Sequence, residues 1–220
     1  MDHKTILVLN TGSSSLKFSL IRATDQQVVL SGLADKLGLA DASITFKQDG
    51  KKKELPLLPG NHKHAVAEIF RYIGDHQLDK AIVGVGHRVV HGGEQFKTST
   101  VIDEKVLAAI EACVPFAPLH NPANLVGIRG TMEVAPHLPQ VAVFDTAFHQ
   151  TIPRHAFLYA VPMEWYRTYG VRRYGFHGTS HQYVVQIAAD ELAIPLEDSA
   201  FISAHLGNGA SATAVLNGHS

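Results

Sequence analysis

One stretch near the N-terminus of this 220-residue chain combines residue types that suit a phosphoryl group. It reads NTGSSSLK, from Asn10 to Lys17. The glycine allows close approach to the backbone, the N–H and hydroxyl groups of Ser13 and Ser15 can donate to phosphate oxygens, and Lys17 supplies positive charge. The stretch is not a P-loop, because Lys17 does not follow a glycine and no helix pattern opens there. The alternative for Lys17 is an exposed lysine on a strand.

Arg88 and Asp145 each stand at the end of an apolar run that predicts a buried strand, and α/β proteins bind ligands at strand ends. Arg88, in GHRVVHGGE, could clamp a carboxylate or phosphate with two hydrogen bonds. Asp145, in VFDTAFH, could hold a magnesium-bound water, orient the arginine or act as a base. The alternatives are a structural ion pair of Arg88, with Glu94 as candidate partner, and capping of a turn by Asp145.

Histidines flank a predicted helix start in YGFHGTSH. Helix N-termini attract anions, so His177 could donate a hydrogen bond to a phosphoryl group in transfer. The pairs His87/His91 and His177/His181 are spaced i, i+4, which also allows a zinc site. That hypothesis is weaker, because neither pair lies in a clear helix and no thiolate set accompanies them. A hydrolase site is disfavoured because GTSH lacks the Gly-x-Ser-x-Gly elbow.

A second glycine-rich loop, His205-Leu206-Gly207-Asn208-Gly209, repeats the phosphate-binding pattern with neutral donors. Like the first loop, it lies between two predicted strands, in the segments ILVLNTGSSSLKFSLI (Ile6–Ile21) and FISAHLGNGASATAVLN (Phe201–Asn217). With Gly12 and Gly207 as equivalent points, the two hairpins predict a duplicated fold that holds a polyphosphate between its halves. The alternative is two ordinary hairpins with flexible tips.

The remaining sequence predicts an α/β fold, in which antiparallel hairpins lead into a partly parallel sheet. Apolar spacing and cap residues predict strands at Gln27–Leu33, Ser43–Gln48, Ala81–Val90 and Val141–Phe144, and helices at His62–His76, Asp103–Ala112, Asn121–Val134 and Thr179–Leu192. We expect a first domain over residues 1–150 and the beginning of a second over 151–220. The turn signal at Asn217-Gly218 has no returning strand, which suggests that the second domain is truncated.

Composition favours a packed globular protein, since 45% of the residues are hydrophobic and 18% charged. The net charge of −1 favours neither nucleic acid nor an anionic membrane as a partner. The basic run Lys51–Lys53 follows Asp49-Gly50, so we expect a solvated turn there. Cys113 is the only cysteine, and neither a signal-peptide core nor a membrane-spanning apolar run is present. We therefore expect a soluble, cytoplasmic protein.

Together these segments resemble the acetate kinase family. The matching stretches are VLNTGSSSLKFSL, GHRVVHGGE, FAPLHNPANL, VAVFDTAFHQTIP, RRYGFHGTSH and AHLGNGAS, in the family's order across essentially the whole chain. The resemblance implies a duplicated actin-like ATPase (ribonuclease H-like) fold, shared with sugar kinases, Hsp70 and actin. It also implies reversible phosphoryl transfer from ATP to acetate, giving acetyl phosphate and ADP. Mg²⁺ is the implied cofactor, with Mn²⁺ possible, and a homodimer the implied full-length form.

The resemblance also implies roles for individual residues. Asn10 would lie on the magnesium side, and the catalytic residues would be Arg88, Asp145 and His177. Acetate would contact Arg88, Val90, Leu119, His120 and Phe176, whereas the ATP phosphates would contact Ser13, Ser15, Lys17, His205, Leu206, Gly207, Asn208 and Gly209.

Family members continue beyond these 220 residues with a second arginine, the adenine-binding segments and a magnesium-linked glutamate. We therefore expect this chain alone to be inactive or nearly so. A propionate kinase would share nearly every motif, and one methylene in an apolar pocket changes binding by only about 1–3 kcal/mol. A non-catalytic nucleotide-binding module of the actin or chaperone type is a further hypothesis. The joint presence of Arg88, Asp145 and His177 argues against it.

Overall fold

The computed structural model describes residues 4–220, which form two compact units. The first unit runs to His91 and includes Thr100–Val143, and the second comprises Gly92–Ser99 and Phe144–Ser220. For most of the chain the division therefore falls near residue 144. The domain limits expected for the whole fold, 1–150 and 151–220, stay a prediction.

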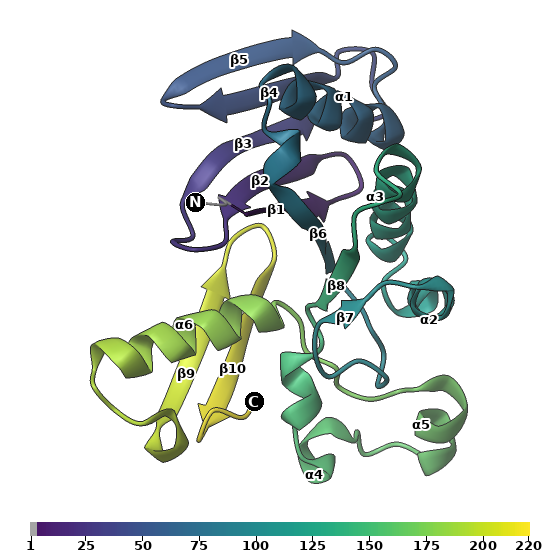
Figure 1. Ribbon diagram of the computed structural model, residues 1–220. Helices are drawn as coiled ribbons and strands as arrows, with labels where there is room; N and C mark the ends of the chain where they lie inside the picture. Colours follow the sequence, from purple (N-terminus) through teal and green to yellow (C-terminus); the bar gives the residue numbers. More distant parts are fainter. Residues whose placement is uncertain (1–3) are drawn as a thin grey trace. The chain divides into compact units, whose positions relative to one another are not determined.

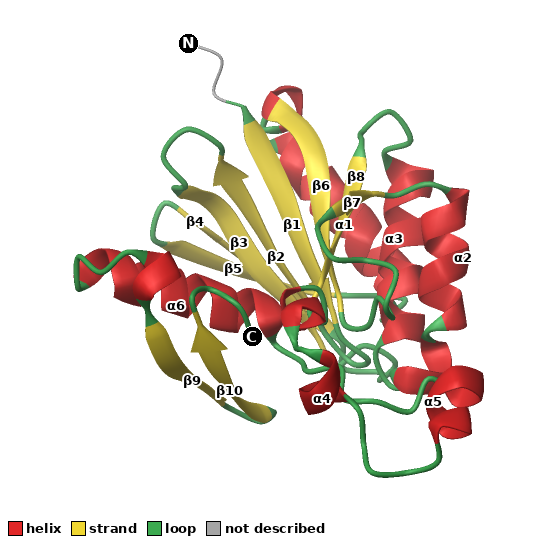
Figure 2. Ribbon diagram, turned by 90° about the horizontal axis from the view of Figure 1, so that it is seen from below, coloured by secondary structure: helices red, strands yellow, loops and turns green. Residues whose placement is uncertain are grey.

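The first unit is built on an eight-stranded sheet of order β5-β4-β3-β2-β1-β6-β8-β7 (Figures 1 and 2). Its strands are β1 Thr5–Thr11, β2 Leu16–Arg22, β3 Val28–Asp35, β4 Ser43–Gln48, β5 Lys51–Pro56, β6 Ile82–Val89, β7 Thr100–Val101 and β8 Gln140–Phe144. Strands β1 to β5 pair antiparallel in succession, whereas β1 and β6 are parallel. The prediction of hairpins that lead into a partly parallel sheet is confirmed.

Three helices belong to this unit: α1 His62–Asp75, α2 Glu104–Ala112 and α3 Asn121–Val134. Helices α1 and α3 lie along the same face of the sheet (Figure 2). Successive strand residues point to opposite faces, so Leu9 and Phe18 enter the core while Asn10 and Lys17 face the other way. The apolar alternation therefore decides which polar side chains stay available for a ligand.

Capping residues set the starts of two helices, α1 and α2. Asp103 accepts a hydrogen bond from Val106 N (2.8 Å) and starts α2, and Asn61 accepts one from His64 N (2.8 Å) and starts α1. The turn at Asp49-Gly50 has both residues at positive φ (50° and 74°), as a tight hairpin requires. Lys51–Lys53 are exposed as expected, but they form strand β5 at the sheet edge, where lysines discourage further pairing.

The second unit contains α4 Arg154–Phe157, α5 Met163–Tyr169, α6 Gly178–Glu191, β9 Ala200–Leu206 and β10 Ala210–Leu216. Strands β9 and β10 form an antiparallel hairpin, and α6 covers one of its faces over a small core that includes Phe148, Val185 and Val215. Helix α6 begins one residue earlier than predicted. The sequence favours Thr179 or Ser180 as its cap, but His177 occupies the cap position. Helices α4 and α5 lie in a stretch whose prolines predict only turns.

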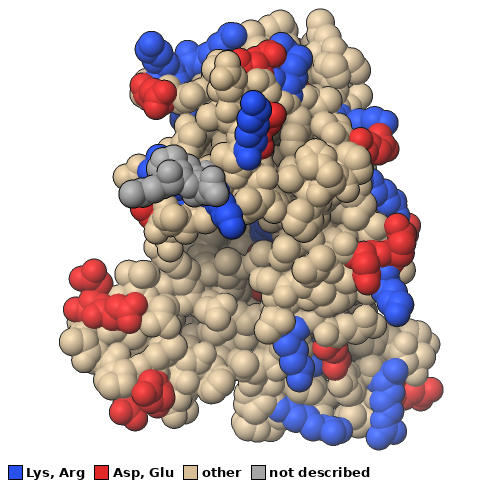
Figure 3. Space-filling model, viewed as in Figure 1, with Lys and Arg blue, Asp and Glu red and all other residues tan. Residues whose placement is uncertain are grey.

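Charged side chains of both signs are interspersed on the face shown in Figure 3, without a large patch of one sign. This distribution agrees with the net charge of −1. Among the described helices, none combines the length and apolarity that a membrane crossing requires.

Two buried histidines of the first unit predict that acid lowers stability. His87 donates from Nε2 to Gln140 Oε1 (2.7 Å), and burial lowers the pKa of both His87 and His91 to about 4. Unfolded histidine titrates near pH 6.5, so the unfolded chain binds more protons between these values, and stability falls as pH drops from about 6.5 to 4. We expect the urea midpoint to fall over this range, and to fall less in His87→Gln. An equal fall in both proteins would contradict the assignment.

Candidate functional site

A row of three polar residues crosses the centre of the first unit's sheet. Lys17 on β2 and Arg88 on β6 both pair with Asn10 on β1, and residues paired across strands point to the same face. Arg88 Nη1 donates to Asn10 Oδ1 over 3.2 Å. This cross-strand row places two cations beside one amide on the face away from α1 and α3. It is suited to an anion such as a carboxylate or phosphate.

The first glycine-rich loop, between β1 and β2, is braced by neighbouring segments. Gly12 N donates to Ser15 O (2.8 Å), His62 Nε2 donates to Gly12 O (2.7 Å), and Leu37 N donates to Ser14 O (2.9 Å). Ser13 and Ser14 are exposed, and their backbone N–H groups form no hydrogen bond with any residue in the described range 4–220. The loop therefore has a held shape and donors that can face a ligand.

Two asparagines of α3 hold the segment that follows Arg88, and sequence reasoning did not single them out. Asn121 accepts from His91 N (3.1 Å) and donates to His91 O (3.0 Å), while Asn124 accepts from Val90 N (3.1 Å) and donates to Thr11 O (2.7 Å). Both amides are buried. Their i, i+3 spacing in FAPLHNPANL, one helical turn, is the signal that could have revealed them.

The residues expected around an acetate methyl group differ in exposure. Val90 is buried at 5% exposure, whereas Leu119 is 73% exposed and Phe176 is 40% exposed. His120 is exposed at the start of α3 and forms no side-chain cap there. Leu119 and His120 lie just before α3, and Phe176 belongs to the second unit. An apolar pocket formed by these side chains stays a prediction.

In the second unit, the turn after β8 is held tightly around Asp145. Gly178 N donates to Asp145 O (2.9 Å), and Gly92 N donates to Thr146 Oγ1 (3.1 Å). Asp145 is buried at 3% exposure. Burial lowers the pKa of His149, and the nearby charge of Asp145 partly opposes this shift. Glu94, the partner considered for Arg88, forms an ion pair with buried Arg172 (3.2 Å).

Four histidines gather at the start of α6 and beside the second glycine-rich loop. The His177 and His205 rings stack with centroids 4.1 Å apart, and His181 lies within ring-contact range of His149 and His205. Serines bind their ring nitrogens: Ser211 bonds both His177 and His181, Ser203 bonds His181, and Ser180 bonds His205. His177 has φ 57°, ψ 27°, a left-handed conformation that is uncommon outside glycine and frequent at functional sites.

The second loop adds exposed backbone donors to this cluster. Gly207, Asn208 and Gly209 are exposed, and within residues 4–220 their N–H groups form no backbone hydrogen bond outside the strand ladder. A Cβ on Gly209 would lie 3.4 Å from His177 Nε2 and Cε1, so that edge of the imidazole faces the loop. In this unit the structure therefore brings His177, His205 and the loop together. The zinc alternative loses support, since serine hydroxyls bind both ring nitrogens of His181.

Gly178 links this cluster to the Asp145 turn, and we predict that its replacement is costly. A Cβ there would lie 2.4 Å from Asp145 O and 3.0 Å from Phe148 Cβ. Overpacking should therefore make Gly178→Ala less stable by about 1–3 kcal/mol. Gly74→Ala in α1 is the matched control: its Cβ meets nothing within 4 Å, so it should gain about 0.5–1 kcal/mol. The free energies of unfolding of both variants test this prediction. Stabilisation by both substitutions would contradict it, because it would show that the Asp145 turn moves to accommodate the added methyl group.

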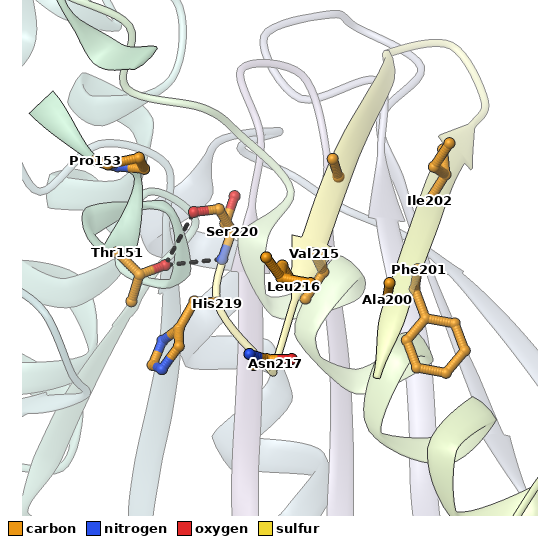
Figure 4. A pocket seen from close by; sticks show the side chains of 11 residues that line it. Thr151, Pro153, Ala200, Phe201, Ile202, Val215, Leu216, Asn217, His219 and Ser220 are labelled. Carbon is orange, nitrogen blue, oxygen red and sulfur yellow. Dashed lines mark hydrogen bonds between the residues drawn. The ribbon is translucent and has the colours of Figure 1, made fainter. Parts of the chain in front are cut away.

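A pocket of about 810 Å³ also lies in the second unit, and none of the residues that line it is a predicted site residue (Figure 4). Its walls are mostly apolar side chains of β9 and β10, and Ser220 N donates to Thr151 Oγ1 (2.9 Å) at one side. The lining residues are Thr151, Pro153, Ala200, Phe201, Ile202, Ala214, Val215, Leu216, Asn217, His219 and Ser220.

Comparison with known proteins relates the chain to kinases that act on small carboxylates. The chain is 51% identical to an acetate kinase of Chromobacterium violaceum and 52% identical to one of Deinococcus radiodurans, over 98% and 97% of its own length. Both alignments cover 54% of the relative, so the chain spans about half the length of the curated relatives it matches.

Solved structures agree with these sequence relatives. A propionate kinase from Francisella tularensis matches with a TM-score of 0.94 at 44% identity, and Porphyromonas gingivalis acetate kinase with 0.91 at 43%. Each match covers 98% of this chain and 56% of the other. The fold is therefore the α/β, actin-like ATPase fold that the sequence predicts. Because the family model also matches residues 5–220, the chain belongs to the acetokinase family.

Proposed function

We propose that the protein containing this chain is an acetate kinase, which transfers a phosphoryl group reversibly between ATP and acetate. The observation that carries the proposal is the cross-strand row of Lys17, Asn10 and Arg88, which offers a clamp for a carboxylate or phosphoryl group. The names of its relatives support acetate as the acceptor. We further propose that the full-length protein is a cytoplasmic homodimer.

The described residues support distinct roles in phosphoryl transfer, a reaction that gains mainly from positioning and charge stabilisation. Arg88 would orient the acetate carboxylate or neutralise phosphoryl oxygens. The loops containing Ser13, Ser15 and Lys17, and His205–Gly209, would bind nucleotide phosphates through N–H, O–H and ammonium donors. His177 would donate to an oxygen of the group in transfer, and Asp145 would orient a water or a cationic side chain.

The protein offers few oxygen ligands for magnesium, so we propose that the nucleotide phosphates supply most of them. The Asn10 amide oxygen is a hard donor with one lone pair beyond its bond from Arg88, and Asp145 offers a carboxylate. Among the described residues, no group of three or more His, Cys, Asp or Glu side chains could hold a metal ion. Bound Mg²⁺ would neutralise phosphate charge. Asn10 in the first unit would hold one of its water ligands, and Mn²⁺ has the same preference for oxygen.

Propionate is the second candidate acceptor, because a propionate kinase shares this fold at a TM-score of 0.94. One additional methylene changes the free energy of binding in an apolar pocket by about 1–3 kcal/mol. Val90, Leu119 and Phe176 are the side chains proposed to sense it.

The test is ADP formation from ATP and Mg²⁺ by the full-length protein and by this 220-residue chain, with acetate and propionate offered separately. We expect turnover with acetate in the full-length protein and little or none in the chain alone. If kcat/KM is higher for propionate than for acetate, the proposed acceptor becomes propionate and the proposed reaction class is unchanged. ATP binding by the full-length protein without turnover on either acid would leave a non-catalytic nucleotide-binding module.

A further inference from the structure

In the second unit, the hydroxyl of Ser211 on β10 bonds two histidines at once. Its Oγ lies 2.8 Å from His177 Nδ1 and 2.8 Å from His181 Nε2. A hydroxyl has one proton, so it can donate to one of these nitrogens and must accept from the other. The proton positions on the two imidazoles are therefore coupled through Ser211.

Ser203 on β9 sets the direction of this coupling. Its side chain is buried at 6% exposure, and Oγ lies 2.9 Å from His181 Nδ1, the one hydrogen bond of this hydroxyl within residues 4–220. If His181 Nδ1 carried a proton, the Ser203 proton would be buried without an acceptor, which is unfavourable. Ser203 therefore donates to Nδ1, and neutral His181 carries its proton on Nε2.

His181 is neutral at pH 7 because its surroundings disfavour a charge. Burial lowers its pKa most, and the neighbouring rings of His149, His177 and His205 lower it further. Its Nε2–H then donates to Ser211, and the Ser211 proton is directed to His177 Nδ1. Neutral His177 must consequently carry its own proton on Nε2, at the edge of the ring that faces Gly209.

We propose that Ser203, His181 and Ser211 form a directed hydrogen-bond chain that holds His177 in its Nε2–H tautomer. The three are positioning residues: they make His177 a hydrogen-bond donor without a positive charge, next to the stacked ring of His205. The tautomer follows from the hydrogen bonds and from the burial of His181, whereas its use in turnover rests on the proposed kinase function. A neutral donor of this kind keeps acting above the ordinary histidine pKa.

The direct test is magic-angle-spinning NMR of the full-length protein with ¹⁵N-labelled histidine at pH 8. The His177 signals are assigned by their loss in His177→Gln. We expect a protonated Nε2 and a bare Nδ1 in the unmutated protein, a mixture of tautomers in Ser211→Ala, and the original tautomer in Ser211→Thr, which keeps the hydroxyl. A protonated Nδ1 or a charged imidazolium in the unmutated protein would overturn the proposal, and this measurement needs no variant at position 211 or 203.

Kinetics test the positioning role separately. Ser211→Ala should lower kcat about 10- to 100-fold, by analogy with the partners that orient metal-ligating histidines, with the KM values for ATP and acetate unchanged and activity restored in Ser211→Thr. In the unmutated protein kcat should stay level from pH 7 to 9. Full activity of a folded Ser211→Ala, or loss of kcat with a pKa near 6.5, would refute the role. Absence of kinase activity in the unmutated protein would instead refute the proposed function. The His177 tautomer would then be tested by NMR alone.

Discussion

Arg88→Ala in the full-length protein is expected to lower kcat/KM for acetate by about 10²- to 10³-fold, the usual loss when one donor to a developing charge is removed. Arg88 is one of two cations in the cross-strand row, and its guanidinium already donates to Asn10. Alanine removes both the charge and the fork that can bind two oxygens. Arg88→Lys keeps the charge alone, so it should recover only part of the loss. Steady-state kinetics with varied acetate and ATP measure both effects.

Arg129→Ala is the matched control for this experiment. Arg129 lies on α3, with its side chain 52% exposed, and pairs with Glu111 over 3.2 Å. Surface ion pairs contribute about 0–1 kcal/mol, so this variant should keep the kinetics of the unmutated protein. If Arg88→Ala binds ATP normally and turns over normally, the clamp has been assigned to the wrong residue. Loss of ATP binding with normal chemistry would assign Arg88 to the nucleotide.

His177→Ala is expected to lower kcat by about 10²-fold or more, with a smaller change in the KM for ATP. The Nε2 edge of this imidazole faces the second glycine-rich loop at Gly209. Its loss would remove a donor to the group in transfer and leave the backbone donors of the loop in place. Kinetics and nucleotide affinity measured side by side separate the two contributions.

Alanine at position 177 also removes a left-handed histidine and its bond to Ser211, so stability must be measured with activity. His177→Asn is the second variant, since asparagine adopts this conformation readily. His155→Ala, at an exposed position in α4, is the control and should change neither quantity. An inactive, well-folded His177→Asn supports the donor role. An active His177→Ala would remove His177 from the mechanism.

The sequence by itself determined the parts of this protein that depend on neighbouring residues. Apolar runs around the two glycine-rich tips placed β1, β2, β9 and β10, helical spacing of apolar residues placed α1, and the cap at Asp103 fixed the start of α2. The six matching sequence stretches also identified the family. These signals are local, because side-chain alternation and capping hydrogen bonds involve residues only a few positions apart. The sequence did not predict strand β5 or helices α4 and α5, because lysine runs and proline-rich stretches favour turns.

Only the tertiary structure decided which distant residues share one place. The register of β1 against β2 and β6 puts Lys17, Asn10 and Arg88 in a row, and a shift of one residue would turn them into the core. The packing of α6 on β9 and β10 likewise joins His177 and His181 to Ser203 and Ser211. Hydrogen bonds between residues far apart in sequence leave no local pattern. The residue types therefore predicted the chemistry. Tertiary packing determined which residues are hydrogen-bond partners and which partner donates the proton.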